Sequence, residues 1–510
     1  MHDTVIPLPR PETGGTVSVE EALHRRRSHR SFQPKPLTLR QLSQLLWAAS
    51  ASPSAGATYP LDIFVVVGTE CVESLDAAVY QYLGEESLGF HAEGDRRDSL
   101  ARAALGQNFV AKAPASQKNA ALRAMRERLS ARQADIVSAN KADLAAAASH
   151  VEAVALLDRL RFGPAKIESR IASLGKIEAL SDPVDEPIEV KRLPNGLEAA
   201  RVRVPLGVIL MIYEARPQVT VNAGAFCLKA GNAAILRGGS EARRCNDLLG
   251  RLWQESLAEA GLPETAIQVI SGSHEEVTEL LQLNEYIDLV IPRGGEGLIR
   301  SVAAASRIPV IKHFAGVCHV YIDEGADIER ALDIALDSKC LMPEVCNAME
   351  TLLVAEVTAG ELPRIVEAFR RHDVVVKGCD RTQSLAPRVE PATEEDWRTE
   401  YLDLTLAVRV VGGIEDAIDH INRYGSHHTD AIVTDSESRA RRFLSEVDSA
   451  VVLLNASTMF CDGESLGMGA EIGISTDKLH ARGPMGLNEL TSYKFVIRGD
   501  GHIMGGPYRD

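Results

Sequence analysis

The chain has 510 residues, which at about 150 residues per domain corresponds to roughly three structural units and excludes a lone small binding module. Apolar residues make up 45% and charged residues 25%, an ordinary balance for a globular protein, so global disorder is excluded as well. The formal net charge of −16 repels phosphate backbones and anionic headgroups. We therefore expect a globular protein that binds neither nucleic acid nor membranes.

The cysteine pattern predicts a reducing compartment. Eight cysteines are scattered along the chain, and none forms the C-x-x-C pair of zinc ribbons or dithiol redox sites. We expect reduced thiols and no bound metal. The N-terminal residues lack the apolar run of a signal peptide, and no stretch approaches the ~18 uninterrupted apolar residues of a membrane span. The sequence therefore predicts a cytoplasmic protein.

The first 114 residues differ in pattern from the rest. Helices are expected over residues 19–30 and 39–49, with Thr38 capping the second, and a strand is expected over residues 62–68. We expect a domain boundary near residue 115.

Two features precede the main body of the chain. Residues 117–148 are Ala-rich, carry charges at helical spacing and contain neither proline nor glycine, so they predict one long amphipathic helix. Residues 186–204 alternate as a strand pair around Asn195-Gly196, which is a strong hairpin signal. Such a hairpin leaves a pairing edge that suits oligomerisation.

From residue 205 onward, short apolar runs alternate with helical stretches. The first series of expected strands covers residues 207–213, 233–236, 267–270, 287–291 and 309–312, with helices starting near residues 218, 240, 274 and 296. The second series covers residues 351–356, 374–376, 405–411, 430–433 and 450–454, with helices starting near residues 360, 414 and 436. Repeated βαβ units predict the α/β class, with two mostly parallel sheets side by side.

Two glycine-rich turns stand where expected strands pass into helices. At such a turn, backbone N–H groups and the helix dipole can meet a diphosphate, although many folds use glycine in tight turns without a ligand. Two turns in one sheet favour a dinucleotide, and Arg237 suits a 2′-phosphate. The candidate cofactor-binding residues are Arg237, Gly238, Gly239, Ser240 and Glu241 in the first turn and Pro292, Arg293, Gly294, Gly295 and Gly297 in the second.

Cys346 follows Pro343 in a loop directly before an apolar strand. A nucleophilic cysteine must be partly exposed and close to positive potential, whereas most single cysteines are buried and inert. Asn347 and nearby backbone N–H groups could stabilise an oxyanion if they lie within hydrogen-bond reach.

A series of ordered motifs resembles a known family. The motifs lie at residues 205–209, 212–217, 229–241, 291–295, 345–348, 424–430, 455–458, 469–473 and 480–484. Together they resemble the γ-glutamyl phosphate reductases, also called glutamate-5-semialdehyde dehydrogenases, over about residues 115–505.

The resemblance implies the aldehyde dehydrogenase fold. It implies an NADPH-binding domain over residues 115–322 that carries the hairpin, a catalytic domain over residues 323–455 and a C-terminal segment over residues 456–510. The implied reaction is NADPH-dependent reduction of L-glutamate 5-phosphate in proline biosynthesis, with a thioester on Cys346 and release of phosphate. Glutamate 5-kinase is the implied supplier of the acyl phosphate, and a homo-oligomer is the implied assembly.

The same resemblance implies further site residues. The substrate has an ammonium, a carboxylate and a phosphate group, so the site needs polar groups of both signs. Candidates in matched motifs are Glu214, Arg216, His427, His428 and Asn455, although the paired histidines could equally form a surface turn. Glu400 aligns with the position that touches the nicotinamide ribose in the superfamily.

Two departures from the superfamily pattern bear on the activity. Residues 313–316 replace the segment that carries the water-activating glutamate of the oxidising members, and they contain no carboxylate, which suits a reductase. Position 459 is Met where the family has Arg. This second departure leaves another acyl-phosphate or acyl-thioester reductase as the alternative.

Residues 1–114 resemble the first half of a nitroreductase-like flavoprotein. The match lies at residues 26–32, 36–38, 42–49, 53–60 and 104–107, and in that family the Arg/Ser cluster, here Arg26, Arg27, Ser28 and Arg30, holds the FMN phosphate. Because the match stops near Pro114, we expect a remnant or docking module without tightly bound FMN. A flavin-binding or regulatory protein with an inactive dehydrogenase part is the alternative from a different class.

Overall fold

The computed structural model describes residues 106–148, 157–271, 274–469 and 471–505, the backbone of residues 154–156, a few single residues before these and the backbone of four short strands near the N-terminus. Contacts divide the chain into two compact units, Met1–Arg102 and Ala103–Asp510.

The four strands of the first unit form one antiparallel sheet. Its order is β1 (Val5–Pro7), β4 (Ser87–Ala92), β3 (Ala78–Tyr82) and β2 (Ile63–Val67). Strand β2 confirms the strand expected at residues 62–68. The helix expected at residues 19–30 and the proposed phosphate-binding Arg/Ser cluster lie outside the described residues, as does all but Leu42 of the helix expected at residues 39–49.

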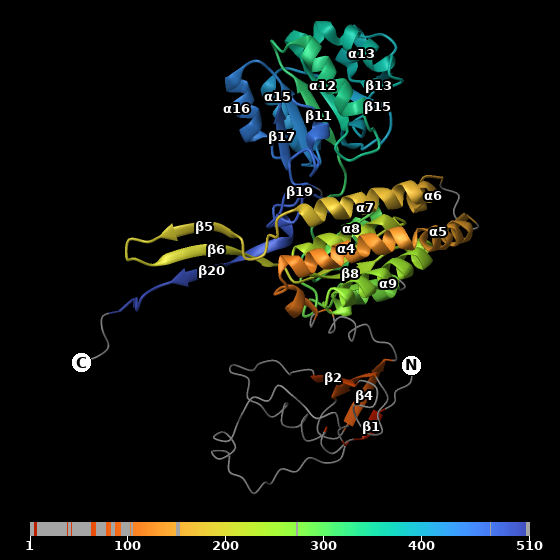
Figure 1. Cartoon of the computed structure of the whole chain (residues 1–510). Coiled ribbons are helices and arrows are strands. Elements are labelled where there is room, and N and C mark those ends of the chain that lie inside the picture. The colour runs from red at the N-terminus through yellow and green to blue at the C-terminus, as the bar shows by residue number, and fades with distance from the viewer. Residues whose placement is uncertain are drawn as a thin grey trace. The chain divides into compact units, whose positions relative to one another are not determined.

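A four-stranded parallel sheet forms the centre of the first half of the second unit (Figure 1). Its order is β10 (Leu289–Arg293), β7 (Val208–Tyr213), β8 (Ala233–Arg237) and β9 (Ile267–Val269). These strands confirm four of the five expected in the first series. The strand expected at residues 309–312 is reduced to one bridge between Val310 and Val290, because Pro309 has no N–H to donate to a ladder.

Helices cover this sheet in layers (Figure 1). Helices α8 and α9 pack on its strands, α4 and α7 pack against them, and α10 and α11 complete the βαβ crossovers. The bounds are α4 (Ala115–Ala131), α5 (Gln133–Ala148), α6 (Val154–Leu160), α7 (Pro164–Ala179), α8 (Pro217–Lys229), α9 (Arg243–Glu259), α10 (His274–Leu280) and α11 (Glu296–Ala305). Of the helices that the structure describes, none combines the length and the apolar character needed to cross a membrane.

The prediction of one helix over residues 117–148 is wrong. The chain leaves helical geometry at Arg132, which has φ −105° and ψ 18°, and resumes as α5. Both α4 and α5 contact α9, and each buries its own apolar residues. Packing on a shared neighbour thus interrupts a segment whose local propensity is helical throughout.

A seven-stranded parallel sheet forms the second half of the unit. Its order is β14 (Glu390–Pro391), β13 (Val375–Gly378), β15 (Thr405–Val411), β12 (Met349–Ala355), β11 (Cys318–Ile322), β16 (Thr429–Val433) and β17 (Val451–Leu454). Helices lie on both faces (Figure 1), with bounds α12 (Ile328–Cys340), α13 (Leu362–Arg370), α14 (Asp380–Leu385), α15 (Ile414–Tyr424) and α16 (Glu437–Glu446).

Of this sheet and its helices, the sequence analysis missed β11, β14, α12 and α14. Strand β11 is central to the sheet, yet His319 interrupts its apolar run. In the structure His319 Nδ1 lies 2.7 Å from Asp430 Oδ1 on the neighbouring β16, and both side chains are fully buried. A partner far away in sequence therefore satisfies the polar group that masks this strand.

The hairpin predicted at residues 186–204 is confirmed. Strands β5 (Pro187–Arg192) and β6 (Glu198–Pro205) pair around Gly196, whose φ of +92° suits glycine. Strand β20 (Thr491–Arg498), which was not predicted, pairs with β6 to make a three-stranded antiparallel sheet. Figure 1 shows this sheet as an arm that extends away from the helices. A short pair, β18 (Gly473–Ser475) and β19 (Gly483–Met485), precedes β20.

Residues 106–114 pack within the second unit, although the sequence analysis grouped them with the N-terminal fragment. The Gln107 side chain accepts a hydrogen bond from Ala233 N at 2.5 Å and donates one to Gly231 O at 3.1 Å. These bonds tie the segment to the connection between α8 and β8.

The packing between α8 and α9 is so close at Gly224 that a mutation can test it. A Cβ at Gly224 would lie 2.8 Å from the indole of Trp253, which is fully buried and donates to Thr220 O. We expect Gly224→Ala to lower the free energy of unfolding by about 1–3 kcal/mol through overpacking, as measured by denaturant titration. Gly360→Ala, where no atom lies within 4 Å of the added Cβ, is the control and should cost clearly less.

Candidate active site

The candidate site lies where the carboxyl edge of the four-stranded sheet faces the amino edge of the seven-stranded sheet. Arg293 is the last residue of β10, whereas Cys346 stands three residues before β12 and Cys318 is the first residue of β11. The charge of Arg293 acts on the Cys346 thiol, so these two edges meet at the cysteine.

The pKa of the Cys346 thiol is raised. The residue is half-buried, and burial is the main reason that its pKa rises to about 11. The Arg293 guanidinium opposes this rise, while the carboxylates of Glu400 and Glu471 add to it. The positive potential expected beside the cysteine is present, but the effect of burial on the thiol pKa outweighs it.

A glycine brings a loop from the first sheet against this cysteine. A Cβ at Gly316 would lie 1.8 Å from Cys346 O, so the position requires glycine. Gly316 N donates to Glu400 Oε1 at 2.7 Å, and Val317 N donates to Ser426 Oγ at 2.8 Å. Glu400, which was expected at the nicotinamide ribose, thus borders the cysteine loop.

Asn347 is buried and binds the turn that follows β17. Its Nδ2 lies 3.4 Å from Thr458 O and 3.2 Å from both Met459 O and Cys461 O. The amide group expected to stabilise an oxyanion is therefore directed at these carbonyl oxygens. Met459, whose side chain is 8% exposed, belongs to the same turn.

The two adjacent histidines diverge. His428 is fully buried, with Nδ1 2.9 Å from Thr429 Oγ1 and 3.6 Å from Cys318 Sγ, and Cys318 in turn donates to Cys346 O at 3.3 Å. Burial lowers the pKa of His428 to about 3, so its imidazole is neutral at physiological pH. His427 turns away and places Nδ1 2.6 Å from Asp448 O.

Asn455 also lies apart from the cysteine. Its Oδ1 accepts from Thr434 N and its Nδ2 donates to Thr434 O, both at 3.0 Å, at a residue with a φ of +52°. These bonds link the ends of β16 and β17, and the described contacts of Asn455 and His427 do not include Cys346.

His313 is a neighbour of this site that the sequence analysis did not single out. Its ring lies 5.8 Å from that of His428, and burial followed by the charge of Arg293 lowers its pKa to about 4. The sequence around His313 does not predict this position, because the position depends on how the loop packs against Cys346 at Gly316.

Two arginines interact electrostatically with the cysteine: Arg293 ends β10, and Arg216 is the N-cap of α8. The pKa of Arg216 is lowered by burial and by the charges of Arg159 and Arg293, and it is raised by Glu214 and Cys346. Among the ion pairs of the described residues, none joins the Arg216 or Arg293 guanidinium to a carboxylate within 4.0 Å. The region beside the thiol therefore suits an anion.

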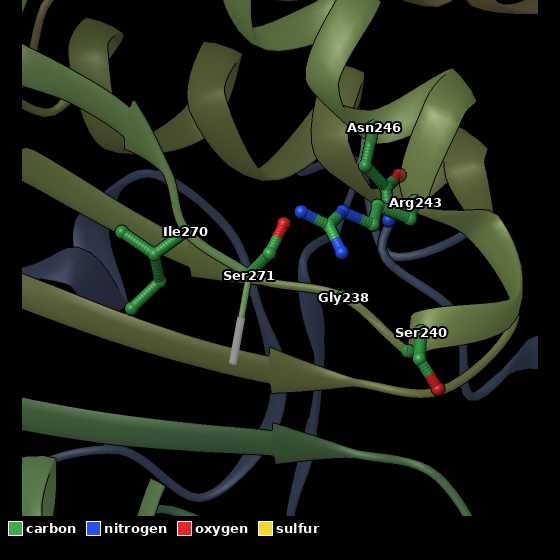
Figure 2. Close-up of a pocket in the computed structure, with 7 residues that line it drawn as sticks. Gly238, Ser240, Arg243, Asn246, Ile270 and Ser271 are labelled. Carbon is green, nitrogen blue, oxygen red and sulfur yellow. The ribbon is translucent and has the colours of Figure 1, made fainter. Parts of the chain in front are cut away.

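Both predicted glycine turns lie on the same edge of the four-stranded sheet, because β8 and β10 flank β7 as parallel neighbours. The first turn opens into a pocket of about 300 Å³ (Figure 2), which is lined by Gly238, Gly239, Ser240, Arg243, Asn246, Ile270 and Ser271. Figure 2 shows the Arg243 guanidinium extending toward Ser271. Arg237, which was expected to be the cation here, is 8% exposed and does not line the pocket.

The sequence analysis did not predict Arg243 as a residue of this pocket, although its place in the sequence indicates it. Ser240–Ala242 form a short 3-10 turn, and Arg243 is the first residue of α9 directly after it. An arginine at the start of the helix that follows a glycine turn is placed to reach a ligand on that turn. Glu241 folds over the turn, since a Cβ at Gly239 would lie 2.3 Å from its Oε2.

The second turn holds a side chain of the protein itself. Glu214 Oε2 accepts from Gly295 N at 2.9 Å, and a Cβ at Gly294 would lie 2.6 Å from Glu214 Cδ. Gly297 faces open space. A carboxylate thus lies at the start of α11, where the helix dipole and free N–H groups favour an anion.

The described residues contain no group of three or more His, Cys, Asp or Glu side chains that could hold a metal ion.

Comparison with known proteins agrees with this geometry. A sequence profile of the aldehyde dehydrogenase family matches residues 70–399. An acetylating aldehyde dehydrogenase from Geobacillus thermoglucosidasius is 17% identical, with a TM-score of 0.57 over 80% of this chain and 97% of that one, and it shares the fold. The fold and the cysteine site thus define a member of the aldehyde dehydrogenase superfamily.

The first of two further structures narrows the assignment. A γ-glutamyl phosphate reductase from Thermotoga maritima is 42% identical, with a TM-score of 0.79 over 80% of this chain and 99% of that one. One from Saccharomyces cerevisiae is 32% identical over 82% of this chain and 100% of that one, with a TM-score of 0.46. The chain belongs to the γ-glutamyl phosphate reductase family.

The charges around Cys346 predict how its reactivity changes on mutation. We expect Glu471→Gln to lower the thiol pKa and Arg293→Gln to raise it, because the first change removes a repelling carboxylate and the second a stabilising cation. The measurement is the pH dependence of iodoacetamide labelling at Cys346, followed by peptide mass spectrometry. Shifts in the opposite directions would contradict this account of the site.

Proposed function

We propose that this chain reduces L-glutamate 5-phosphate to L-glutamate 5-semialdehyde with release of phosphate, using NADPH, as a step of proline biosynthesis. The observation that carries the proposal is a half-buried thiol, Cys346, beside the guanidiniums of Arg216 and Arg293, which lack carboxylate partners among the described residues. An acyl phosphate presents an electrophilic carbon next to a dianionic leaving group. The thiol suits attack on the carbon, and the guanidiniums suit the phosphate. Membership of the family supports the choice of substrate.

The cations that bind the phosphate come from the first sheet. Met459 is buried and supplies no charge at the position where the family has arginine. Arg216 and Arg293 are therefore assigned to the substrate anions, which moves Arg293 from the cofactor to the substrate. The Glu471 carboxylate, whose charge reaches Cys346, offers a partner for the α-ammonium group.

The Cys346 thiol must lose its proton to react. Arg293 stabilises the resulting thiolate, and the proton passes to solvent at the half-buried sulfur. The thiolate forms a bond to the acyl carbon as the bond from that carbon to the phosphate oxygen breaks, and the arginine pair receives the departing phosphate. The product of this step is a thioester on Cys346.

When bound, NADPH supplies the hydride that reduces this thioester. Cys346 then leaves as the thiolate and frees the aldehyde. Hydrolysis of the thioester is disfavoured, because residues 313–316 carry no carboxylate, while Glu400 and Glu471 accept hydrogen bonds from Gly316 N and Gly463 N.

The cofactor fits the edge of the four-stranded sheet. Gly238, Gly239, Ser240 and Arg243 would hold the adenosine end with its 2′-phosphate, since they line a pocket that carries a guanidinium. Gly294 and Gly295 would hold the diphosphate at the start of α11, and Glu400 would contact the nicotinamide ribose next to Cys346.

The arm of β5, β6 and β20 supports self-association. Its apolar side chains include Val190, Phe495 and Ile497, which are 55%, 63% and 61% exposed. Exposed apolar side chains on an extended sheet suit pairing with a second copy of the chain. Supply of the acyl phosphate by glutamate 5-kinase and a cytoplasmic location stay predictions.

Replacement of the nucleophile tests the mechanism. We expect Cys346→Ala to reduce turnover below about one-hundredth of wild type while NADPH affinity is retained, because the thioester cannot form. The assay is NADP⁺ reduction driven by glutamate semialdehyde and phosphate. Cys340→Ala is the control and should cost little, since Cys340 is the last residue of α12 and makes no part of the site. Substantial turnover in Cys346→Ala would rule out the assignment.

The choice of cofactor tests the pocket of Figure 2. We expect Arg243→Ala to raise the Kd for NADPH roughly tenfold and to leave the Kd for NADH nearly unchanged, since a charge-assisted hydrogen bond to the 2′-phosphate is lost. Arg237→Ala is the matched comparison and should not discriminate between the two cofactors. If discrimination follows Arg237 instead, the assignment to Arg243 is wrong.

A further inference from the structure

Glu214 lies in the middle of the edge that the proposed cofactor would follow. It comes directly after β7, and β7 lies between β8 with the first glycine turn and β10 with the second. The pocket with Arg243 is on one side of this position, and Arg293 with Cys346 is on the other. A ligand that reaches from the pocket to the thiol along this edge must pass the end of β7.

The Glu214 carboxylate already occupies an anion-binding position there. Its Oε2 accepts from Gly295 N at 2.9 Å, at the start of a helix of ten residues. The absence of a side chain at Gly294 makes room for it, because a Cβ would lie 2.6 Å from Glu214 Cδ. A diphosphate that used the same N–H group would meet a carboxylate of like charge.

A second partner for this carboxylate is near. Arg216 follows two residues later, and the charge of Glu214 is among those that raise the pKa of its guanidinium. None of the described ion pairs joins Arg216 to a carboxylate within 4.0 Å. A Glu214 carboxylate displaced from Gly295 N therefore has a guanidinium without a carboxylate partner close by.

We propose that Glu214 occupies the diphosphate position in the cofactor-free enzyme and moves to Arg216 when the cofactor binds. The inference rests on the proposed function, since it assumes a dinucleotide on this edge. It assigns Glu214 as a positioning residue that links the two sites. In the cofactor complex Arg216 is paired with Glu214, so one fewer guanidinium is available to an anion beside Cys346.

This exchange predicts that the cofactor and phosphate each weaken the binding of the other. If the cofactor weakens phosphate binding by pairing Arg216 with Glu214, phosphate must weaken cofactor binding by the same factor. Removal of the Glu214 charge abolishes both the competition at Gly295 and the pairing with Arg216.

The test is direct binding to the full chain, measured by calorimetry with NADPH and separately with inorganic phosphate in the presence and absence of NADP⁺. We expect Glu214→Gln to bind NADPH several-fold more tightly than wild type. In wild type NADP⁺ should weaken phosphate binding several-fold, and this coupling should disappear in Glu214→Gln. The matched control is Glu296→Gln, in the first turn of the same helix, where the carboxylate accepts from Arg300 Nε at 2.7 Å. Its Kd for NADPH should stay within about twofold of wild type, because Glu296 already has its own partner.

The outcomes separate this inference from the proposed function. A wild type that binds NADPH, with equal or weaker binding in Glu214→Gln, overturns the inference alone and indicates that Glu214 is a structural helix cap. A wild type that does not bind NADPH overturns the cofactor assignment together with the inference. Circular dichroism verifies folding, and Glu214→Ala serves as the second variant, with tighter NADPH binding again expected.

Discussion

The close approach of Gly316 to Cys346 is the constraint on which the site depends. A Cβ at position 316 would lie 1.8 Å from Cys346 O and 2.6 Å from its carbonyl carbon, so no other residue fits without moving one of the two loops. The same loop delivers Gly316 N to Glu400 Oε1 and Cys318 Sγ to Cys346 O. Because of this contact, the carboxyl edge of one parallel sheet meets the amino edge of another with the thiol between them.

The charges at this junction are divided between the two sheets. Arg293 ends β10 of the four-stranded sheet and Arg216 caps α8 after β7, whereas Cys346 and Glu400 come from the segments around the seven-stranded sheet. Burial raises the thiol pKa to about 11, and the Arg293 guanidinium opposes this rise. Because Arg216 and Arg293 lie on other elements than position 459, the site presents positive charge to an anion even though it lacks the family arginine at that position.

Several candidate residues support the site without facing the substrate. Asn347 directs its amide at three carbonyl oxygens of the 458–461 turn, and Asn455 binds both backbone groups of Thr434. These bonds hold the loops at the edge of the seven-stranded sheet in place. His428 is buried and neutral, and it contacts Cys318 and the ring of His313. Motif membership therefore identifies the residues of this edge, but it does not separate those that bind ligand from those that shape the loops.

The sequence by itself determined the features that depend on local signals. Alternating apolar runs and turn residues predicted ten strands for the two parallel sheets, and nine of them are present in the structure. Asn195-Gly196 predicted the hairpin. The sequence context of Cys346 and of the glycine turns indicated which sheet edges carry the candidate site. Only the tertiary structure decided the break at Arg132, the burial of His319 against Asp430 within β11, and the pairing of β20 with β6. It also decided that Arg243 and not Arg237 lines the pocket, and that Arg293 acts on Cys346. The physical reason is the same in each case: the deciding contact joins residues from different elements, and the periodicity of one segment carries no information about which side chain a neighbouring element brings to it.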